Sequence, residues 1–287
     1  MDGPNAGGHS VITEENWMTN SLDLDAYLAR IQWGGSTRPG YDTLAGILHA
    51  HMSRIPFENL DVLLRRPIRL DLDGVQAKLV GARRGGYCFE HGTLLAAVLE
   101  KLGFQPIRHI ARVVLRMPRT EAPRTHMFLS VPLTEGTFIV DPGFGALAPR
   151  IPVPLVDGKE AHIERETHWM ARDEDGWTLR AKAADKIVDC WFSPLERDNP
   201  VDFEMGNHYT STHPASGFVN RITMRALTEN GGRVSVMNRD VTHTRADRAE
   251  SVQLADRTAL RELLAGHFGI DLPEVERIRV PTIPEWD

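Results

Sequence analysis

The spacing of the apolar residues changes near residue 105, and this change limits the chain to folds that combine helices with a sheet. Before this point, apolar residues recur every three or four positions, as in amphipathic helices. From Ile107 onward they form short runs broken by glycine, proline or aspartate, which is typical of strands. The order of the two patterns predicts an α+β protein, with a helical bundle followed by a small antiparallel barrel or sandwich.

The helical part contains three expected helices ahead of a cysteine. Apolar spacing predicts helices over 24–31 and 44–52. Either Asp71 or Asp73 is expected to cap a third helix that ends at Gly81. Pairing the first two helices would bury the apolar stripe of each, so this part is expected to form a bundle.

Two groups of strands are expected in the rest of the chain. A polar stretch that ends at Pro200 separates them and marks an expected domain boundary. In the second group, Asn230-Gly231-Gly232 predicts a hairpin turn, and Gly269 is expected to end a final helix. The expected strands cover residues 107–115, 127–133, 137–140, 167–171, 177–181, 187–192, 222–227 and 234–236.

Composition argues against several classes of protein. The net charge is −6 and the pI is about 6.1, whereas a nucleic-acid-binding surface is basic. The longest apolar run, 94–99, is far shorter than the roughly 20 residues of a membrane span. Residues 1–20 lack the apolar centre of a signal peptide and are expected to be a flexible leader. The only cysteines are Cys88 and Cys190, so a disulfide framework is implausible and a reducing cytoplasm fits.

Cys88 follows a turn that contains two glycines, Arg84-Gly85-Gly86-Tyr87, and precedes an apolar helix that is expected to end at Gly103. The unpaired N–H groups and the dipole at a helix start favour an anion, so a thiolate there is stabilised relative to a thiol. Arg83 and Arg84 add positive charge upstream. A structural cysteine at an ordinary loop-to-helix junction would show the same local pattern. Cys190, within an expected strand, is interpreted as core filling.

His126 stands near the head of one expected strand, and Asp141 follows the next one. The turn at Thr134-Glu135-Gly136 would make these strands antiparallel neighbours and bring the two residues side by side. With Cys88 packed beneath them, they can act as nucleophile, base and orienting acid. Each signal alone is weak, because a strand histidine is more often structural and Asp-Pro-Gly is usually a turn.

Together these segments resemble the three triad motifs of the arylamine N-acetyltransferases, in the same order and with similar spacing. The motifs are RGGYCFEH at 84–91, the strand that starts with Thr125-His126, and VDPGFG at 140–145. Further matches are IPFENL at 55–60, RVV at 112–114 and YTSTHP at 209–214, so the resemblance covers about residues 20 to 270. Two residues depart from the family pattern and could alter the pocket: Gly92 replaces the usual asparagine, and Pro142 a small apolar residue.

The resemblance implies an α+β fold with an N-terminal helical bundle, a central antiparallel β-barrel and a C-terminal α/β lid, around a cysteine-protease-like triad core. The implied division is a leader at 1–20, a bundle at 21–104, a barrel at 105–198 and a lid at 199–287. It further implies a cytoplasmic enzyme of xenobiotic metabolism, monomeric or homodimeric, with no nucleic-acid or membrane partner. No metal site is expected, since Cys88 and His91 lack a second ligand pair at zinc spacing.

The resemblance also implies a role for each site residue. The implied reaction transfers an acetyl group from acetyl-CoA, through a Cys88 thioester, to the amino group of an arylamine, arylhydrazine or N-hydroxyarylamine. The implied catalytic residues are Cys88, His126 and Asp141. Those implied to bind CoA are Thr125, Gly143, Phe144 and Gly145. Those implied to line the acceptor pocket are Phe57, Val113, Phe144 and Phe218, although core packing would also account for them.

Three alternatives remain open from the sequence. A cysteine hydrolase of transglutaminase or protease type uses the same triad and passes the acyl group to water instead of an amine. A binding or scaffold protein with a vestigial triad would have an inert thiol. An amide synthase that closes a macrolactam also looks like this family, and its genomic neighbourhood would set it apart. The physiological acceptor, the acyl chain, the oxyanion geometry and the oligomeric state do not follow from the sequence.

Overall fold

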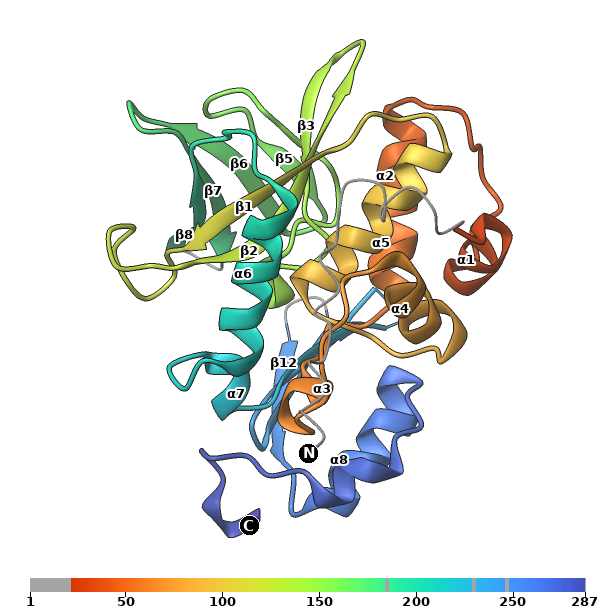
Figure 1. Ribbon diagram of the computed structural model, residues 1–287, viewed down its shortest axis with the longest axis vertical. Helices are drawn as coiled ribbons and strands as arrows, with labels where there is room; N and C mark the ends of the chain where they lie inside the picture. The colour runs from red at the N-terminus through yellow and green to blue at the C-terminus, as the bar shows by residue number, and fades with distance from the viewer. Residues whose placement is uncertain (1–21, 184–185, 229–230, 246–247, 287) are drawn as a thin grey trace, which may run out of the picture.

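The computed structural model describes residues 22–183, 186–228, 231–245 and 248–286 (Figure 1). Helices come first, then a large sheet, then a second sheet with a helix. In Figure 1 the large sheet lies at the top left, the first helices at the right, and the second sheet and α8 below. The expected leader at 1–20 lies outside the described residues. The main helices are α1 (Leu24–Ile31), α2 (Tyr41–Arg54), α3 (Leu60–Leu63), α4 (Leu72–Gln76), α5 (Cys88–Lys101), α6 (Pro200–Thr212), α7 (Gly217–Asn220) and α8 (Arg257–Leu263).

The ends of the first helices confirm the sequence predictions. Asp71 caps α4 by accepting a hydrogen bond from the N–H of Gly74 at 2.9 Å, which decides between the two predicted caps. A π-helical turn continues α4 and ends at Gly81. Helix α5 begins at Cys88 itself, and the φ of Gly103 beyond its end is +88°, a left-handed conformation that favours glycine. Helices α1, α2 and α5 share one apolar core.

Eight strands form one antiparallel sheet in the order β4-β3-β2-β1-β8-β7-β6-β5. A bridge between Asp157 and Met170 brings the chain after β4 back onto β6, so the sheet is nearly closed. The predicted barrel-like sheet is thus confirmed. Its strands are β1 (Ile107–Val113), β2 (Arg124–Leu133), β3 (Gly136–Val140), β4 (Val153–Pro154), β5 (Ala161–Ile163), β6 (Glu166–Arg172), β7 (Trp177–Ala183) and β8 (Lys186–Ser193). Strands β4 and β5 were not expected, because two or three residues are too few to show alternation.

The interior of this sheet is filled by its own apolar cluster. The rings of Phe128 and Trp191 stack there with centroids 4.0 Å apart. Cys190 is fully buried beside them, which confirms its interpretation as core. Burial raises the pKa of the Cys190 thiol, so this cysteine stays protonated and unreactive.

The chain after residue 199 supplies α6, α7, α8 and a four-stranded sheet in the order β12-β11-β10-β9. The predicted β9–β10 hairpin is confirmed, although Asn230 in its turn lies outside the described residues. Helix α6 was missed because it buries only Phe203, Gly206 and Thr210, too few residues for an apolar period. The β11–β12 hairpin was missed because every residue of β12 is exposed. These strands are β9 (Thr223–Leu227), β10 (Arg233–Met237), β11 (Asp240–Arg245) and β12 (Arg248–Gln253). The three-domain division with its lid stays a prediction.

Candidate active site

The turn before Cys88 is held against the chain on both sides. The N–H of Tyr87 donates to the Glu90 carboxylate at 3.0 Å and so closes the first turn of α5. At Gly85, a Cβ atom would come within 2.1 Å of the Pro56 carbonyl oxygen, so only glycine fits there. The turn therefore fixes Cys88 as the first residue of α5, where its side chain is 3 % exposed.

A buried ionic cluster anchors the same turn. The Arg84 guanidinium donates to Glu58 at 2.7 Å and to Asp61 at 3.2 Å. The Lys78 ammonium contacts Asp61 and Glu90, each at 2.7 Å. Burial by itself lowers the pKa of Lys78, but the surrounding carboxylates outweigh burial and raise it, so the lysine stays charged. Removing one buried partner would leave another charge uncompensated, so breaking this cluster would destabilise the turn.

His126, on β2, and Asp141, directly after β3, lie next to each other in the interior. The His126 Nε2 and Asp141 Oδ2 atoms are 2.8 Å apart, and both side chains are buried. Asp141 also accepts hydrogen bonds from the indole N–H of Trp191 at 2.8 Å and from the N–H of Gly143 at 3.1 Å. These three donors fix the carboxylate, and its bond to Nε2 leaves Nδ1 of His126 for another partner.

The charge state of His126 follows from its neighbours. Burial by itself lowers the pKa of His126, but Asp141 and, to a smaller extent, Cys88 outweigh burial and raise the pKa to about 10. The imidazole is therefore protonated at neutral pH. The Cys88 thiol lies close enough to hydrogen-bond His126, and its Sγ atom is 3.7 Å from the carbonyl oxygen of Thr125. A positively charged imidazole beside the sulfur favours the thiolate form of a cysteine.

The turn after β3 packs directly on the start of α5. A Cβ atom at Gly143 would come within 2.4 Å of the Cys88 Cα, so a side chain there would push the turn off the helix. The next residue, Phe144, is half-buried, and its ring meets His126 edge-on with centroids 4.9 Å apart. Gly145 has a φ of +66° and allows the chain to leave the site.

The remaining residues implied by the resemblance lie around this centre. The Phe57 ring is buried, and its centroid is 6.0 Å from that of Phe218 on α7. Tyr87 also packs against Phe218, so an aromatic group borders the turn that carries Cys88. Val113 ends β1, two residues beyond Ala111, which pairs with His126. Val113 also pairs with Trp191 of β8, the residue whose indole binds Asp141.

Two residues of the site were missed from the sequence. Trp191 supplies a donor to Asp141, and the signal was present, because a buried tryptophan usually needs a partner for its N–H. Arg225 on β9 donates to the carbonyl oxygen of Gly145, and its backbone pairs with Phe57 through two hydrogen bonds of 2.8 and 2.9 Å. Arg225 thus connects the second sheet to Phe57 and to Gly145. No spacing in the sequence indicates this connection.

A buried chain of hydrogen bonds links α1, α2 and α5 behind the site. The Tyr27 hydroxyl donates to Nδ1 of His51 at 2.9 Å, His51 Nε2 lies 2.8 Å from Nδ1 of His91, and His91 Nε2 lies 3.2 Å from the Pro56 carbonyl oxygen. The carbonyl can only accept, so His91 donates through Nε2; in a neutral His91 ring Nδ1 then accepts, and His51 donates to it through its own Nε2. Burial lowers the pKa of His51 well below 6.5 and that of His91 to about 4.

We expect the free energy of unfolding to fall as the pH drops from about 6.5 towards 4. Both buried histidines stay neutral in the folded chain, whereas they gain protons near pH 6.5 when unfolded, so their contribution is present above this pH and lost below it. For His91 alone the loss amounts to about 3 kcal/mol. Urea unfolding at several pH values measures it. In His91→Gln, whose amide cannot titrate, the decline should be shallower, and an equal slope in both proteins would contradict this assignment.

Metal and membrane features are absent from the described residues. Within residues 22–286, apart from the gaps named above, no group of three or more His, Cys, Asp or Glu side chains could hold a metal ion. No helix in this part of the chain is both long and apolar enough to cross a membrane.

Comparison with known proteins identifies the enzyme class and then the family. Residues 41–277 match the family model described as N-acetyltransferase, so the chain is an acetyltransferase. It is 36 % identical to the arylamine N-acetyltransferase of Mycobacterium tuberculosis over 260 residues, which cover 89 % of this chain and 92 % of that protein. It is 34 % identical to the Escherichia coli arylamine N-acetyltransferase over 254 residues, covering 88 % and 90 %. The chain belongs to the arylamine N-acetyltransferase family.

Solved structures of the family have the same fold. The M. smegmatis arylamine N-acetyltransferase superposes with a TM-score of 0.84 at 35 % identity, covering 93 % of this chain and 99 % of that one. The Mycobacterium marinum enzyme in complex with CoA gives 0.83 at 33 % identity, covering 88 % and 94 %. The recognition of the family from its motifs is therefore confirmed.

Proposed function

We propose that this enzyme transfers an acetyl group from acetyl-CoA, through a thioester on Cys88, to the amino group of arylamines, arylhydrazines or N-hydroxyarylamines. The observation that carries the proposal is the position of Cys88 at the first residue of α5, beside a His126 that is hydrogen-bonded to Asp141. Two relatives support the substrates: the M. marinum structure contains CoA, and the Salmonella typhimurium relative, 32 % identical over 258 residues, is also named an N-hydroxyarylamine O-acetyltransferase.

In the first half-reaction the Cys88 thiolate attacks the carbonyl carbon of the acetyl thioester. The carbonyl electrons move onto oxygen, and N–H groups at the start of α5, which lack intrahelical partners, are suited to stabilise this oxyanion. As the tetrahedral intermediate collapses, the bond to the CoA sulfur breaks and CoA leaves as a thiolate, which can take a proton from the His126 imidazolium. The products are acetylated Cys88, free CoA and a neutral His126.

In the second half-reaction the amine nitrogen attacks the acetyl carbon of the Cys88 thioester. Neutral His126 takes the proton that the nitrogen loses, and Asp141 stabilises the imidazolium that forms. The carbon–sulfur bond then breaks, which releases the acetylated amine and restores the thiolate. Because Asp141 accepts three hydrogen bonds, it holds the imidazole in one orientation through both halves.

Substrate contacts are proposed from the residues around this centre. Thr125 and the turn of Gly143, Phe144 and Gly145 would hold the pantetheine arm and pyrophosphate of CoA. The acceptor ring would lie among aromatic and aliphatic side chains: Phe57, Val113, Phe144 and Phe218.

We further propose that residues 199–287 act as a lid that keeps water from the thioester. Support for the lid comes from Phe218, which contacts Phe57 and Tyr87, and from the hydrogen bond between Tyr87 and Asn207. A cytoplasmic location and a role in xenobiotic metabolism are part of the same proposal.

Steady-state kinetics test the proposed cycle. Donor and acceptor occupy the site in turn, so double-reciprocal plots against acetyl-CoA at several arylamine concentrations should be parallel. Without amine, free CoA should appear as one burst equal to the number of active sites and then only slowly. If CoA release continues at the same rate without amine, water is the acceptor, and the enzyme is a hydrolase.

A further inference from the structure

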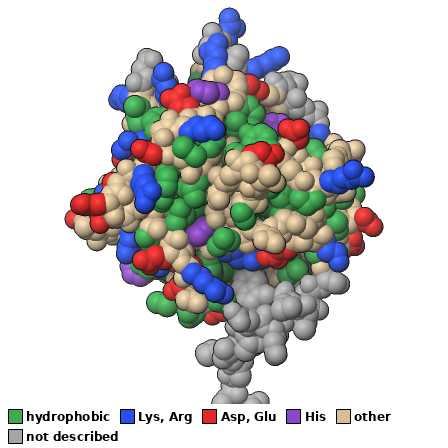
Figure 2. All heavy atoms as spheres, turned by 90° about the horizontal axis from the view of Figure 1, so that it is seen from above, with side chains coloured by type: hydrophobic (Ala, Val, Ile, Leu, Met, Phe, Trp, Pro, Cys, Tyr) green, Lys and Arg blue, Asp and Glu red, His purple; other side chains and the backbone are tan. Residues whose placement is uncertain are grey.

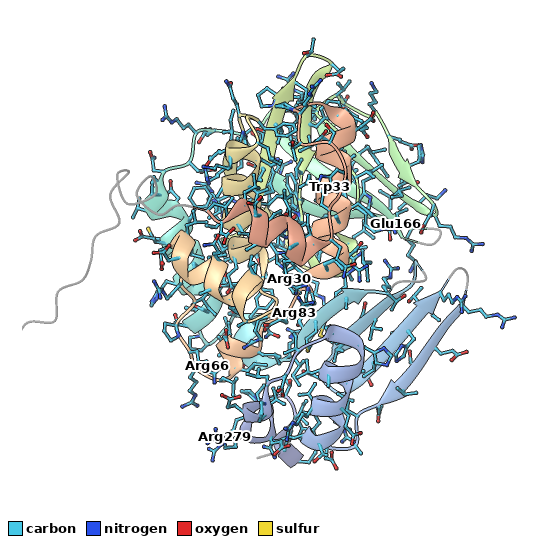
Figure 3. All side chains as sticks on the ribbon, turned by 90° about the vertical axis from the view of Figure 1, so that its right-hand side faces the viewer. Arg30, Trp33, Arg66, Arg83, Glu166 and Arg279 are labelled. Carbon is cyan, nitrogen blue, oxygen red and sulfur yellow. The ribbon has the colours of Figure 1, made fainter. Side chains whose placement is uncertain are left out.

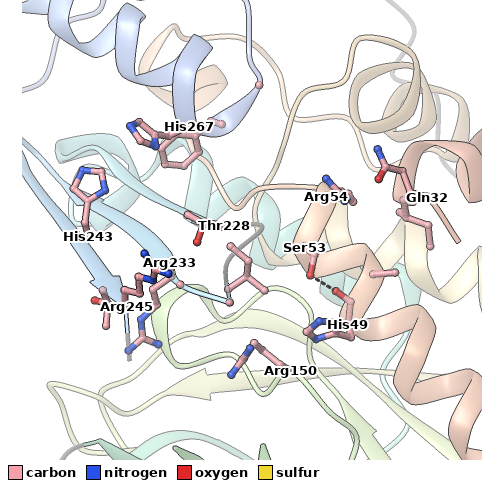
Figure 4. A pocket seen from close by; sticks show the side chains of 18 of the residues that line it. Gln32, His49, Ser53, Arg54, Arg150, Thr228, Arg233, His243, Arg245 and His267 are labelled. Atoms are coloured by element: carbon pink, nitrogen blue, oxygen red, sulfur yellow. Dashed lines mark hydrogen bonds between the residues drawn. The ribbon is translucent and has the colours of Figure 1, made fainter. Parts of the chain in front are cut away.

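A large cleft lies where the helical part, the large sheet and the second sheet meet. Its volume is about 930 Å³, which suits a nucleotide-sized ligand. Helices α1 and α2 form one side, and β10, β11 and the π-helical turn Leu264–Phe268 form the other side (Figure 4). Arg150, from the segment before β4, lies at the floor, and Glu164, from the loop before β6, also lines the cleft. None of the three proposed catalytic residues, and none of the residues proposed above to contact CoA or the acceptor, belongs to its lining.

The lining of this cleft is strongly basic although the chain as a whole is acidic. Only one carboxylate, Glu164, belongs to the described lining, whereas the net charge of the chain is −6. On the face seen in Figure 2, by contrast, basic and acidic side chains are interspersed. The basic lining residues are Arg30, Arg54, Arg83, Arg150, Arg233 and Arg245, joined by His49, His243 and His267. Figure 4 shows several of them approaching the cleft from opposite sides.

The arginines on the helical side repel one another. The Arg30 guanidinium donates to the carbonyl oxygens of Leu79 at 3.0 Å and Arg83 at 3.2 Å. These two acceptors are uncharged, so they do not neutralise its positive charge. Burial, and then the positive charges of Arg83 and Arg54, lower the pKa of Arg30 to about 10. Figure 3 shows Arg30 and Arg83 together at the edge of the helices that faces the second sheet. A bound anion would relieve this repulsion.

On the sheet side the positive charge is only partly compensated. Arg150 is paired with Glu164 at 2.7 Å and with Glu166 at 3.0 Å, and Arg233 approaches Glu166 at 3.3 Å. Arg245, at the end of β11, is exposed and borders the same space. The imidazoles of His243 and His267 meet edge-on, with centroids 5.0 Å apart, and add donors at this rim. The cleft thus offers guanidinium groups on two facing walls.

A wall of backbone separates the cleft from Cys88. Phe57 and Arg225 pair through both of their backbone groups, and the Arg225 side chain binds the carbonyl oxygen of Gly145. Leu227, two residues along β9 from Arg225, borders the cleft. A ligand in the cleft would therefore contact the opposite side of the strand that supports Phe57 and Gly145.

We propose that this cleft binds a small polyphosphate, a molecule with two or more linked or neighbouring phosphate groups. Guanidinium groups bind phosphate oxygens in a bidentate manner. Several arginines on facing walls therefore suit a ligand with several phosphate groups better than a ligand with a single carboxylate. Two sources have this chemistry, a free nucleotide and the nucleotide end of CoA. The inference rests on the cleft alone and needs no acetyl transfer, so it can fail or hold independently of the proposed function.

Calorimetric titration of the full chain with inorganic tripolyphosphate tests the inference. We expect saturable binding that weakens as salt is added, because Arg83 and Arg245 are exposed charges that salt ions screen. The double variant Arg83→Gln with Arg245→Gln removes one guanidinium from each wall and should weaken binding about tenfold or more, equivalent to about 1.4 kcal/mol or more. Arg277→Gln, an exposed arginine outside the lining, is the matched control and should bind like the unmodified chain. No saturable binding, or equal weakening in the control, would overturn the inference.

A competition experiment distinguishes the two sources. If CoA displaces tripolyphosphate and 3′-dephospho-CoA does so less well, the cleft takes the nucleotide end of the acyl donor, and the pyrophosphate of CoA does not lie at Thr125 and Gly143 to Gly145 as proposed above. If CoA and tripolyphosphate bind at the same time, so that CoA does not displace tripolyphosphate, the cleft takes a separate nucleotide. Both results support a polyphosphate site. Circular dichroism checks that the double variant is folded. If it is unfolded, the titration uses the single variant Arg245→Gln, whose residue lies at an exposed strand end.

Discussion

Cys88→Ala is expected to abolish acetyl transfer and to leave no acetylated protein after incubation with acetyl-CoA. The thiolate is the only group in the proposed cycle that forms a bond to the acetyl carbon in the first half-reaction. Removing the nucleophile of the analogous serine triad lowers kcat by about 10⁶. Intact-protein mass spectrometry detects the adduct directly, since the unmodified enzyme should gain one acetyl group and the variant none.

The second cysteine provides the matched control. Cys190→Ala removes a thiol that lies in the core of the large sheet and is kept protonated by burial, so it should retain acetylation and turnover. Iodoacetamide near pH 6 should label Cys88 far faster than Cys190 in the unmodified chain, because only a thiolate reacts readily. Equal labelling of the two cysteines, or an acetyl adduct that persists without Cys88, would rule out the proposed nucleophile.

Asp141→Asn is expected to lower turnover by about 10⁴, the effect of the same change in a serine triad. In this structure Asp141 accepts from three donors: the His126 ring, the Trp191 indole and the Gly143 N–H. An amide cannot accept from all three, since its NH₂ group would face one of the donors. Loss of the negative charge also removes the main cause that raises the pKa of His126, so the imidazolium is no longer favoured at neutral pH.

Two comparisons isolate the role of Asp141 in catalysis. Asp189→Asn changes an exposed carboxylate of the same sheet, paired with Arg180 at 2.7 Å, and should leave turnover unaffected. Combining Asp141→Asn with His126→Ala should be little worse than either single change, because residues that act as one unit are not additive. Fully multiplicative losses would mean that the two residues perform separate steps.

The helices and strands that the sequence predicted well share a strong local pattern. The start of α5 at Cys88 followed from the turn with its two glycines and the apolar period after it, and the β2–β3 hairpin followed from Thr134-Glu135-Gly136 between two apolar runs. Helix α6 and strand β12 lack such a pattern because their side chains are mostly polar or exposed. They are held in place by neighbours that lie elsewhere in the chain.

The sequence by itself determined the α+β architecture, the position of Cys88 at a helix start, and the family, since each depends on residues a few positions apart. Only the tertiary structure decided that Trp191 donates to Asp141, that Arg225 holds Gly145, and that arginines from separate parts of the chain gather in one cleft. The first two contacts join residues 50 and 80 positions apart in the sequence. A local period encodes which face of a helix or strand is buried, but the partner that meets this face is fixed only when all the elements pack together.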